Sequence, residues 1–196
     1  MTHFSPAIFL DRDGTLIVEK HYLHRPEEVE IFPEVPKALL RLMAAGYRLV
    51  VITNQSGVGR GYFTMADVDR VHEQMIKELR IQGVVLDAIY SAPEAPDQPS
   101  RGRKPSPQFF WDARESLGLD LAHSYMIGDK RVDLEAGWNA GLAGALLVRT
   151  GYGAALEKAE PESLAPAIVV DGMAEAVDWI LSRPHVKAPK TRATPR

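Results

Sequence analysis

Two aspartates, Asp11 and Asp13, lie two residues apart directly after a short apolar segment. The segment, residues 7–10, reads Ala-Ile-Phe-Leu and is followed at once by Asp-Arg-Asp-Gly-Thr. A short unbroken apolar run is typical of a buried strand in a parallel sheet, and the abrupt change to charge and glycine predicts that the strand ends there. Open α/β sheets bind ligands at the carboxyl ends of their strands, so we expect both aspartates in a functional site.

The spacing of the two aspartates also indicates their chemistry. Strand alternation predicts that Asp11 and Asp13 project to the same side while Arg12 points away, and Gly14 lets the backbone turn. Two carboxylates so close repel each other unless a cation or a proton intervenes. We therefore expect Mg²⁺ on one carboxylate and a titratable proton on the other, which describes a metal-assisted nucleophile beside a general acid/base.

Three later segments offer the other groups that phosphoryl transfer requires. A second predicted strand, residues 47–52, is followed by Thr-Asn-Gln-Ser, a run of small donors suited to phosphate oxygens. Lys104 brings a cation from a loop. A further strand, residues 123–127, is followed by Asp129 and Asp133, which could hold a metal. Phosphoryl transfer spreads negative charge over oxygens, and such donors and cations would stabilise that charge.

Each segment alone also has an ordinary structural explanation. An Asp-x-Asp-Gly run is often a turn whose aspartates bind backbone amides, and Thr53 and Asn54 could simply end a strand. Lys104 could be a solvated loop cation, and Asp129 could be the N-cap of a helix. The occurrence of all four segments at successive strand ends or loops favours the catalytic interpretation.

Together the four segments resemble the motifs of the haloacid dehalogenase-type phosphatases. Asp-x-Asp-Gly-Thr, Thr-Asn after a later strand, a lone lysine and Gly-Asp-x-x-x-Asp occur in this order. More narrowly, residues 8–14, 53–61, 103–105 and 124–133 are similar to the heptose bisphosphate phosphatases, and the likeness runs from about residue 7 to about residue 150. The resemblance implies a Rossmann-like core. It also implies removal of the 7-phosphate of D-glycero-D-manno-heptose 1,7-bisphosphate, a precursor for cell-envelope glycans.

The resemblance further implies roles for individual residues. Asp11 would attack phosphorus to form an aspartyl-phosphate, and Asp13 would protonate the leaving sugar oxygen and then activate water. Thr53 and Lys104 would stabilise the transferring phosphoryl group. The implied magnesium ligands are the Asp11 carboxylate, the Asp13 backbone carbonyl and Asp129, with Asp133 orienting Lys104 or the metal shell.

Short loops are expected to provide specificity, because residues 15–46 and 91–104 leave no room for a cap domain. In the heptose bisphosphate phosphatases that this sequence resembles, the residue that matches Arg103 helps to recognise the substrate. A second, non-reacting phosphate would give this arginine a bidentate partner. The predicted substrate-binding residues are Glu19, Tyr22, Asn54, Gln55, Ser56, Arg60, Arg103 and Lys130.

One departure from the resembling family lies just before Arg103. Those enzymes usually carry a zinc loop of three cysteines and a histidine, whereas the matching positions here are Ala92, Glu94, Ser100 and Gly102. The chain has no cysteine, so we expect no zinc in this loop. Its prolines predict a stiff loop in place of the metal. The departure leaves substrate identity open, with histidinol phosphate or a broader set of small sugar phosphates as the alternative.

Composition indicates one domain and limits its partners. The chain has 196 residues, 45% of them hydrophobic and 25% charged, and no segment approaches the ~20 apolar residues of a membrane span. We expect a single capless domain over residues 1–182 and a basic, disordered tail over residues 183–196. The tail carries five Lys/Arg and no acid, so the body has a charge of about −8, from 18 basic and 26 acidic residues.

An acidic body is poorly suited to a phosphate backbone, so we expect a small sugar-phosphate substrate and no nucleic acid. We also expect no membrane association, a monomer and a cytoplasmic location, because the N-terminus lacks the features of a signal peptide. A polynucleotide 3′-phosphatase would share Thr-Asn-Gln and Arg-Gly, but the charge argues against it. A phosphate-binding or regulatory module without turnover would require a broken motif, and every motif is present.

Strands and helices are expected to alternate between the motifs and to form a doubly wound parallel sheet of the α/β class. Thr64 begins a segment with a capping-box pattern, and the helix that follows should end near Gly83, with His72 on its surface. The other predicted helices cover residues 34–45, 107–117, 132–140 and 174–181, and the remaining strands cover residues 84–90, 145–148 and 167–170.

Overall fold

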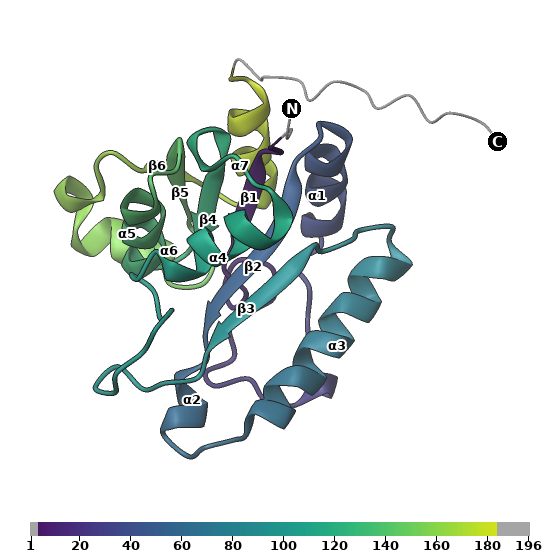
Figure 1. Cartoon of the computed structure of the whole chain (residues 1–196), viewed down its shortest axis with the longest axis vertical. Helices are drawn as coiled ribbons and strands as arrows, with labels where there is room; N and C mark the ends of the chain where they lie inside the picture. The colour runs from purple at the N-terminus through teal and green to yellow at the C-terminus, as the bar shows by residue number, and fades with distance from the viewer. Residues whose placement is uncertain (1–3, 184–196) are drawn as a thin grey trace.

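The computed structural model describes residues 4–183, which form a six-stranded parallel sheet with helices on both faces (Figure 1). The strand order is β3-β2-β1-β4-β5-β6. The strands are β1 Ala7–Leu10, β2 Arg48–Asn54, β3 Ala88–Ala92, β4 Tyr125–Gly128, β5 Gly144–Val148 and β6 Ile168–Val170. The predicted α/β class and doubly wound parallel sheet are confirmed. Of the predicted tail, all but Arg183 lies outside the described residues.

Both faces of the central strand β1 are buried. Ile8 and Leu10 belong to one apolar cluster, whereas Ala7 and Phe9 belong to the other. All four side chains have no exposed surface. A strand buried on both faces has apolar residues throughout instead of an alternating pattern, which is why the sequence reveals it so clearly.

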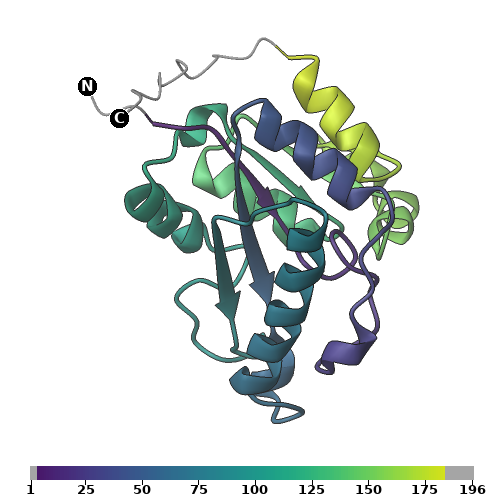
Figure 2. The same ribbon diagram turned by 90° about the vertical axis from the view of Figure 1, so that its right-hand side faces the viewer.

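Helices from two groups cover the faces of the sheet. The helices α1 Val35–Ala44, α3 Met65–Ile81 and α7 Met173–Leu181 pack on one face, and α4 Gln108–Leu117 and α5 Arg131–Ala140 pack on the other. Figure 2 shows α1 and α7 side by side, where Arg41 and Asp178 form an ion pair of 2.7 Å. The shorter elements are α2 Ser56–Gly59, α6 Gly153–Ala159 and the 3₁₀ turns Pro26–Glu28, Leu121–His123 and Pro161–Leu164.

Local signals set the limits of the long helices. The capping box of α3 forms as predicted: the Asp67 amide donates to Thr64 Oγ1 at 3.3 Å, and the Thr64 amide donates to Asp67 Oδ2 at 2.7 Å. This exchange satisfies two amides that the first helical turn leaves free. At the other end of a helix, Gly118 follows α4 with φ of 65°, a left-handed conformation that glycine adopts without strain.

The third predicted strand is displaced along the chain. The apolar run at residues 84–90 predicts a strand there, but β3 begins only at Ala88. Val84 is fully buried without pairing, and Asp87 ends the approach to the sheet by accepting hydrogen bonds from the Leu49 amide (2.8 Å) and the Arg48 side chain (2.7 Å). Apolar residues in a connection that packs on the core look the same in sequence as residues of a strand.

The predicted surface position of His72 is wrong. Its side chain is only 8% exposed and lies on the buried side of α3 with Val68, Val71 and Met75. These positions repeat at the spacing of a single helix face, so helical geometry itself places His72 inside. The polarity of the imidazole led to the incorrect prediction.

The order in which successive strands are added to the sheet changes direction beside β1. From β1 the chain adds β2 and β3 on one side, and the later strands extend from β4 on the other. The carboxyl ends of β1 and β4 therefore meet at a topological switch point, where open sheets bind ligands. Within residues 4–183 we find no separate cap domain over this edge. Among the same residues, no helix has the length and apolar character needed to cross a membrane.

Candidate active site

Three buried carboxylates meet at the switch point. Asp11 follows β1, Asp129 follows β4, and Asp133 lies in the first turn of α5. One oxygen from each lies within 4.8 Å of the others. The Asp11 amide still donates to the carbonyl of Ile127 in β4 at 3.0 Å, so the sheet ladder fixes the first carboxylate relative to the second. The structure thus brings together the three predicted acids that come from strand ends.

Lys104 joins this cluster from a distant loop. Its Nζ lies 2.8 Å from Asp11 Oδ1 and 2.6 Å from Asp133 Oδ1, and it donates to the Ile52 carbonyl at 2.6 Å. Asn54 fixes the lysine backbone: the Lys104 amide donates to Asn54 Oδ1 at 3.0 Å, and Asn54 Nδ2 donates to the Lys104 carbonyl at 3.1 Å. The predicted solvated alternative for Lys104 is wrong, because this residue is only 2% exposed.

Burial and charge oppose each other in setting the pKa values of the cluster. Burial alone would raise the pKa of Asp11, but the charges of Lys104 and Lys130 outweigh it and hold that pKa below its usual range. Burial, together with the charge of Asp11, raises the pKa of Asp129 to about 8. Burial disfavours the charged form of Lys104, yet the carboxylates of Asp11 and Asp133 raise the lysine pKa. Asp11 is therefore ionised at neutral pH, as a carboxylate nucleophile must be.

The surroundings of Asp129 fit a hard cation. Its Oδ2 accepts a hydrogen bond from the Tyr152 amide at 2.8 Å, but its buried Oδ1 has no hydrogen-bond partner. A β-carbon on Gly14 would lie 2.3 Å from Asp129 Oδ2, and one on Gly151 would lie 2.2 Å from the same atom. Asp129 Oδ1 lies 3.7 Å from Lys130 Nζ, an ion pair without a hydrogen bond. A buried carboxylate oxygen without a hydrogen bond, next to further carboxylates, is the kind of oxygen donor that Mg²⁺ prefers.

Asp13 lies in a different set of contacts from Asp11. Arg12 donates to it through Nε to Oδ2 and through NH2 to Oδ1, both at 3.0 Å. Gln55 Nε2 also donates to Asp13 Oδ2, at 3.1 Å, and to Thr53 Oγ1, at 2.8 Å. The prediction that Arg12 points away is wrong, because β1 ends at Leu10 and strand alternation no longer applies in the turn that follows.

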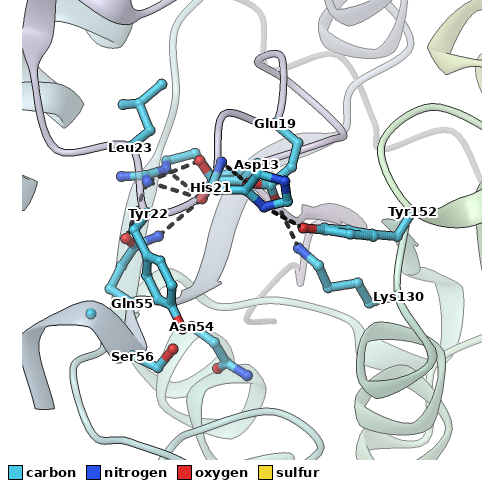
Figure 3. Close-up of a pocket in the computed structure, with 12 residues that line it drawn as sticks. Asp13, Glu19, His21, Tyr22, Leu23, Asn54, Gln55, Ser56, Lys130 and Tyr152 are labelled. Atoms are coloured by element: carbon cyan, nitrogen blue, oxygen red, sulfur yellow. Dashed lines mark hydrogen bonds and ion pairs between the residues drawn. The ribbon is translucent and has the colours of Figure 1, made fainter. Parts of the chain in front are cut away.

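Asp13 and Gln55 line an open cavity of about 500 Å³. The other predicted catalytic and metal-binding residues are not among its lining residues: Asp11, Thr53, Lys104, Asp129 and Asp133. Figure 3 shows Tyr22 and Gln55 on one side of it, and Lys130 and Tyr152 on the other. Six of the predicted substrate-binding residues line the cavity: Glu19, Tyr22, Asn54, Gln55, Ser56 and Lys130. The remaining two, Arg60 and Arg103, are not among its lining residues.

Arg103 is partly buried beside the cavity. Its guanidinium donates to the Glu94 carbonyl at 3.1 Å. Burial and the charge of Arg60 lower the pKa of Arg103, and the acid Glu94 partly offsets this. The two arginines therefore lie within electrostatic range of each other, and Arg103 also within range of Tyr22, which lines the cavity. We call Arg60 and Arg103 together the basic region.

The sequence analysis missed the wall formed by residues 150–152. The Tyr152 hydroxyl lies 2.9 Å from His21 Nδ1, and Lys130 Nζ lies 4.9 Å from the centroid of the Tyr152 ring. His21 and Tyr22 both adopt a left-handed backbone, with φ of 47° and 56°. An aromatic residue between two glycines, at Tyr152, was the available signal, but nothing in the local pattern indicates which distant loop it meets. Leu23, which also lines the cavity, gave no sequence signal either, whereas Gly57 lies in the segment 53–61 on which the family resemblance rests.

Two family models match the chain. The HAD-hydrolase-like model matches residues 102–176, and the polynucleotide kinase 3 phosphatase model matches residues 6–133. Among curated proteins, D-glycero-beta-D-manno-heptose-1,7-bisphosphate 7-phosphatase of Escherichia coli K12 is 39% identical over 184 residues, 90% of this chain and 88% of the relative. The phosphatase of the same name from Haemophilus ducreyi is 41% identical over 172 residues, 84% of this chain and 94% of the relative.

Solved structures give the same result. The D,D-heptose 1,7-bisphosphate phosphatase from B. bronchiseptica, complexed with magnesium and phosphate, superposes with a TM-score of 0.81 and 33% identity over 90% of this chain and 98% of that one. The corresponding phosphatase from Burkholderia thailandensis has a TM-score of 0.68 and 31% identity, over 91% of this chain and 99% of that one.

The fold, the buried aspartate cluster and these matches define a phosphoric monoester hydrolase with a haloacid dehalogenase-like core. Enzymes of this class depend on magnesium in general. The chain belongs to the D-glycero-beta-D-manno-heptose-1,7-bisphosphate 7-phosphatase family. The family resemblance and the enzyme class expected from the sequence are confirmed.

Proposed function

We propose that this protein hydrolyses the 7-phosphate of D-glycero-D-manno-heptose 1,7-bisphosphate through an aspartyl-phosphate on Asp11. The observation that carries the proposal is the buried ion pair of 2.8 Å between Lys104 Nζ and Asp11 Oδ1, two residues before Asp13, which lines an open cavity. The pair keeps the nucleophile ionised and also places a positive charge where the phosphoryl oxygens arrive. The names of its relatives supply the substrate.

The residues divide the reaction between them. Asp11 attacks phosphorus, the bond to the leaving sugar oxygen breaks, and Asp13 gives that oxygen its proton. Asp13 then takes a proton from water, which attacks phosphorus and releases Asp11. Lys104 and the hydroxyl of Thr53 stabilise the charge that spreads over the phosphoryl oxygens during both steps.

Asp11, Asp129 and the backbone carbonyl of Asp13 would hold Mg²⁺, with Asp133 supporting Lys104. When bound, the ion would neutralise the phosphoryl charge and screen the repulsion between the carboxylates. The loop before Lys104 needs no zinc in this proposal, because hydrogen bonds connect it: the Ser100 hydroxyl donates to Glu94 at 2.6 Å and accepts from the Arg103 amide at 3.0 Å.

We propose that residues at the edge of the cavity recognise the sugar. Lys130 lies 3.2 Å from Glu19 and faces the cavity, while Arg60 and Arg103 form the basic region beside it. We propose that this basic region binds the non-reacting phosphate and that Glu19 and Tyr22 contact sugar hydroxyls. A charged second phosphate gains most from arginine, which can donate two hydrogen bonds at once.

We further propose a cytoplasmic monomer with small sugar phosphates as its only partners, without binding to nucleic acid or membranes. The charge of about −8 on residues 1–182, from 18 basic and 26 acidic residues, supports this by repelling polyanions. The single-domain limit at residue 182 is part of the same proposal.

A substrate panel tests the function. Purified protein with Mg²⁺ should release phosphate from heptose 1,7-bisphosphate far faster than from histidinol phosphate or a 3′-phosphorylated oligonucleotide. Asp11→Asn should keep the fold, judged by circular dichroism, and abolish release from every substrate. Faster turnover of histidinol phosphate would overturn the substrate assignment. Near-normal turnover by Asp11→Asn would overturn the aspartyl-phosphate.

A further inference from the structure

We propose that Arg12 is a positioning residue that, together with Gln55, fixes the carboxylate of Asp13 for proton transfer. The inference rests on the proposed function, in which Asp13 serves as the general acid and base. Nothing in the sequence pattern assigns such a role to Arg12, and strand alternation would direct it elsewhere.

The contacts of Arg12 are those of a clamp on one carboxylate. Its guanidinium donates through Nε to Asp13 Oδ2 and through NH2 to Asp13 Oδ1, both at 3.0 Å. The same NH2 donates to Gln55 Oε1 at 3.1 Å, and Gln55 Nε2 donates to Asp13 Oδ2 at 3.1 Å. The three side chains form a closed ring of hydrogen bonds, which restricts rotation of the Asp13 carboxylate about its χ angles.

Burial makes the clamp rigid. Arg12 is only 1% exposed, and it is among the largest fully buried side chains of the described residues. An arginine taken out of water needs partners that compensate for lost hydration. Asp13 and Gln55 accept the hydrogen bonds of Nε and NH2, whereas the buried NH1 has no hydrogen-bond partner. The two planar groups therefore have little freedom to separate.

The ring also ties Asp13 to the phosphoryl-binding side of the site. Gln55 Nε2 donates to Thr53 Oγ1 at 2.8 Å as well as to Asp13. Asp13 Oδ2 accepts from both Arg12 and Gln55, whereas Oδ1 accepts a hydrogen bond from Arg12 alone. Oδ1 is consequently the oxygen with acceptor capacity left for the proton that it exchanges with the leaving oxygen or with water.

A test must separate positioning of the acid from general stability. An alkoxide leaving group, as in a sugar phosphate, needs its proton when the P–O bond breaks, whereas p-nitrophenolate leaves without one. The value of kcat/KM covers the steps through leaving-group release, so a selective loss on the sugar phosphate reports either proton donation or recognition of the sugar. The Asp13→Asn background separates the two, because a recognition loss would persist there and a loss of proton donation would not. A merely structural loss would lower both values by the same factor.

Arg12→Met should lower kcat/KM for heptose bisphosphate roughly 10- to 100-fold more than for p-nitrophenyl phosphate, because a general acid contributes about 10² to 10⁴ in rate and depends on its geometry. Arg12→Lys should recover part of the lost selectivity. Gln55→Leu removes the second half of the clamp and should show the same selective loss. It also serves if Arg12→Met does not fold. Equal losses on both substrates in these variants would overturn the proposal.

Two further variants give the controls. His72→Leu changes a neighbouring buried residue that has no place in the ring, and it should leave the ratio of the two kcat/KM values unchanged. Asp13→Asn should itself lose activity selectively toward heptose bisphosphate, and adding Arg12→Met should then cause no further selective loss. If Asp13→Asn is selective but Arg12→Met is not, only the clamp fails. If Asp13→Asn is not selective, the proposed acid fails.

Discussion

Lys104 connects more parts of the site than any other side chain described here. It pairs with Asp11 after β1 and with Asp133 on α5, and its backbone is held by Asn54 at the end of β2. Two unit charges about 4 Å apart attract by about 4 kcal/mol at an effective dielectric near 20. One buried cation therefore offsets much of the repulsion between the two carboxylates and lowers the pKa of each, against the effect of burial.

Substitution of the adjacent cations Arg103 and Lys104 should lower kcat/KM for different substrates. Arg103→Ala removes the contact that we propose to the second phosphate, and a charge-assisted hydrogen bond contributes about 1.5–3 kcal/mol. We therefore expect a roughly ten- to hundred-fold loss in kcat/KM for heptose bisphosphate and little change for p-nitrophenyl phosphate. Lys104→Ala should damage both, because both substrates present a phosphoryl group. Equal losses for the two substrates in Arg103→Ala would show that Arg103 has no role in recognition.

His72 should make the folded protein sensitive to acid. Burial and the charge of Arg12 lower its pKa to about 3, from about 6.5 in the unfolded chain. A histidine whose pKa falls on folding contributes fully to the free energy of unfolding above pH ~6.5. This contribution is lost as the pH falls toward about 3, because the unfolded chain takes up the proton first.

Between pH 6.5 and pH 5 this linkage should cost the wild type about 2 kcal/mol of unfolding free energy. His72→Leu should remove that part of the pH dependence, whatever its stability at neutral pH. Urea unfolding of both proteins at the two pH values measures the difference. The same loss in variant and wild type would show that His72 is protonated equally in both states.

Individual residues could be predicted from the sequence where their chemistry depends on local sequence context. The aspartates at strand ends and the loop lysine were recognisable because acids and cations have few reasons to follow an apolar strand. Arg12 and His72 were misplaced for opposite reasons. Strand geometry was extended to Arg12 beyond the end of β1, and the polarity of His72 was given more weight than the helical spacing that buries it.

The elements of the fold control the site through close approaches of backbone. Residues 14 and 151 approach Asp129 from two distant segments, and Gly151 has φ of 57°. A left-handed conformation costs a residue with a side chain roughly 1–2 kcal/mol. At Gly151 a side chain would also displace Asp129, whereas Gly118 at the end of α4 has nothing within 4 Å of the place where a β-carbon would be.

Gly151→Ala and Gly118→Ala form a matched pair that separates strain from displacement. Both should lower the melting temperature by a few degrees, because each forces alanine into a left-handed conformation. Only Gly151→Ala should also lower kcat, at least tenfold, because it pushes the Asp129 carboxylate out of place. Thermal melts and turnover with Mg²⁺ measure the two effects. Full activity in Gly151→Ala would contradict the crowding around Asp129.

The predictable elements are those with a strong period or a clear end signal. The first strand, the capping box at Thr64 and the end of the following helix near Gly83 could be predicted directly from the sequence. The start of β3 could not, because the apolar residues Val84 and Leu86 pack on the core before the strand begins to pair at Ala88. Helices as short as α2 have too few residues to show a period.

For the whole molecule, the acid cluster and the cysteine-free loop differ in their capacity to bind metals: the cluster suits a hard cation, and the loop lacks ligands for zinc. The cluster offers three buried carboxylates, which suit a hard cation, and the chain contains no thiolate to hold a soft one. The loop is instead connected by side-chain hydrogen bonds and by packing of Gly59, whose amide donates to the Pro93 carbonyl at 2.8 Å.

Chelation should therefore stop turnover without unfolding the chain, and Mg²⁺ alone should restore it. Elemental analysis of the purified protein should find less than a stoichiometric amount of zinc. Circular dichroism before and after chelation checks that the fold is kept. One tightly bound zinc per chain, or activity that returns only with zinc, would refute this reading of the loop.

The wall formed by residues 150–152 has a consequence for the order in which the enzyme is made. A ribosome has delivered all four catalytic segments once Asp133 has left it, yet the Asp129 carboxylate still lacks the amide of Tyr152, which donates to it at 2.8 Å. The hydroxyl of Thr150 likewise binds the Gly14 carbonyl at 2.6 Å, across 136 positions of sequence. A nascent chain that already contains all four segments thus still lacks two contacts of the site, and we expect activity only once the chain has been made through Tyr152.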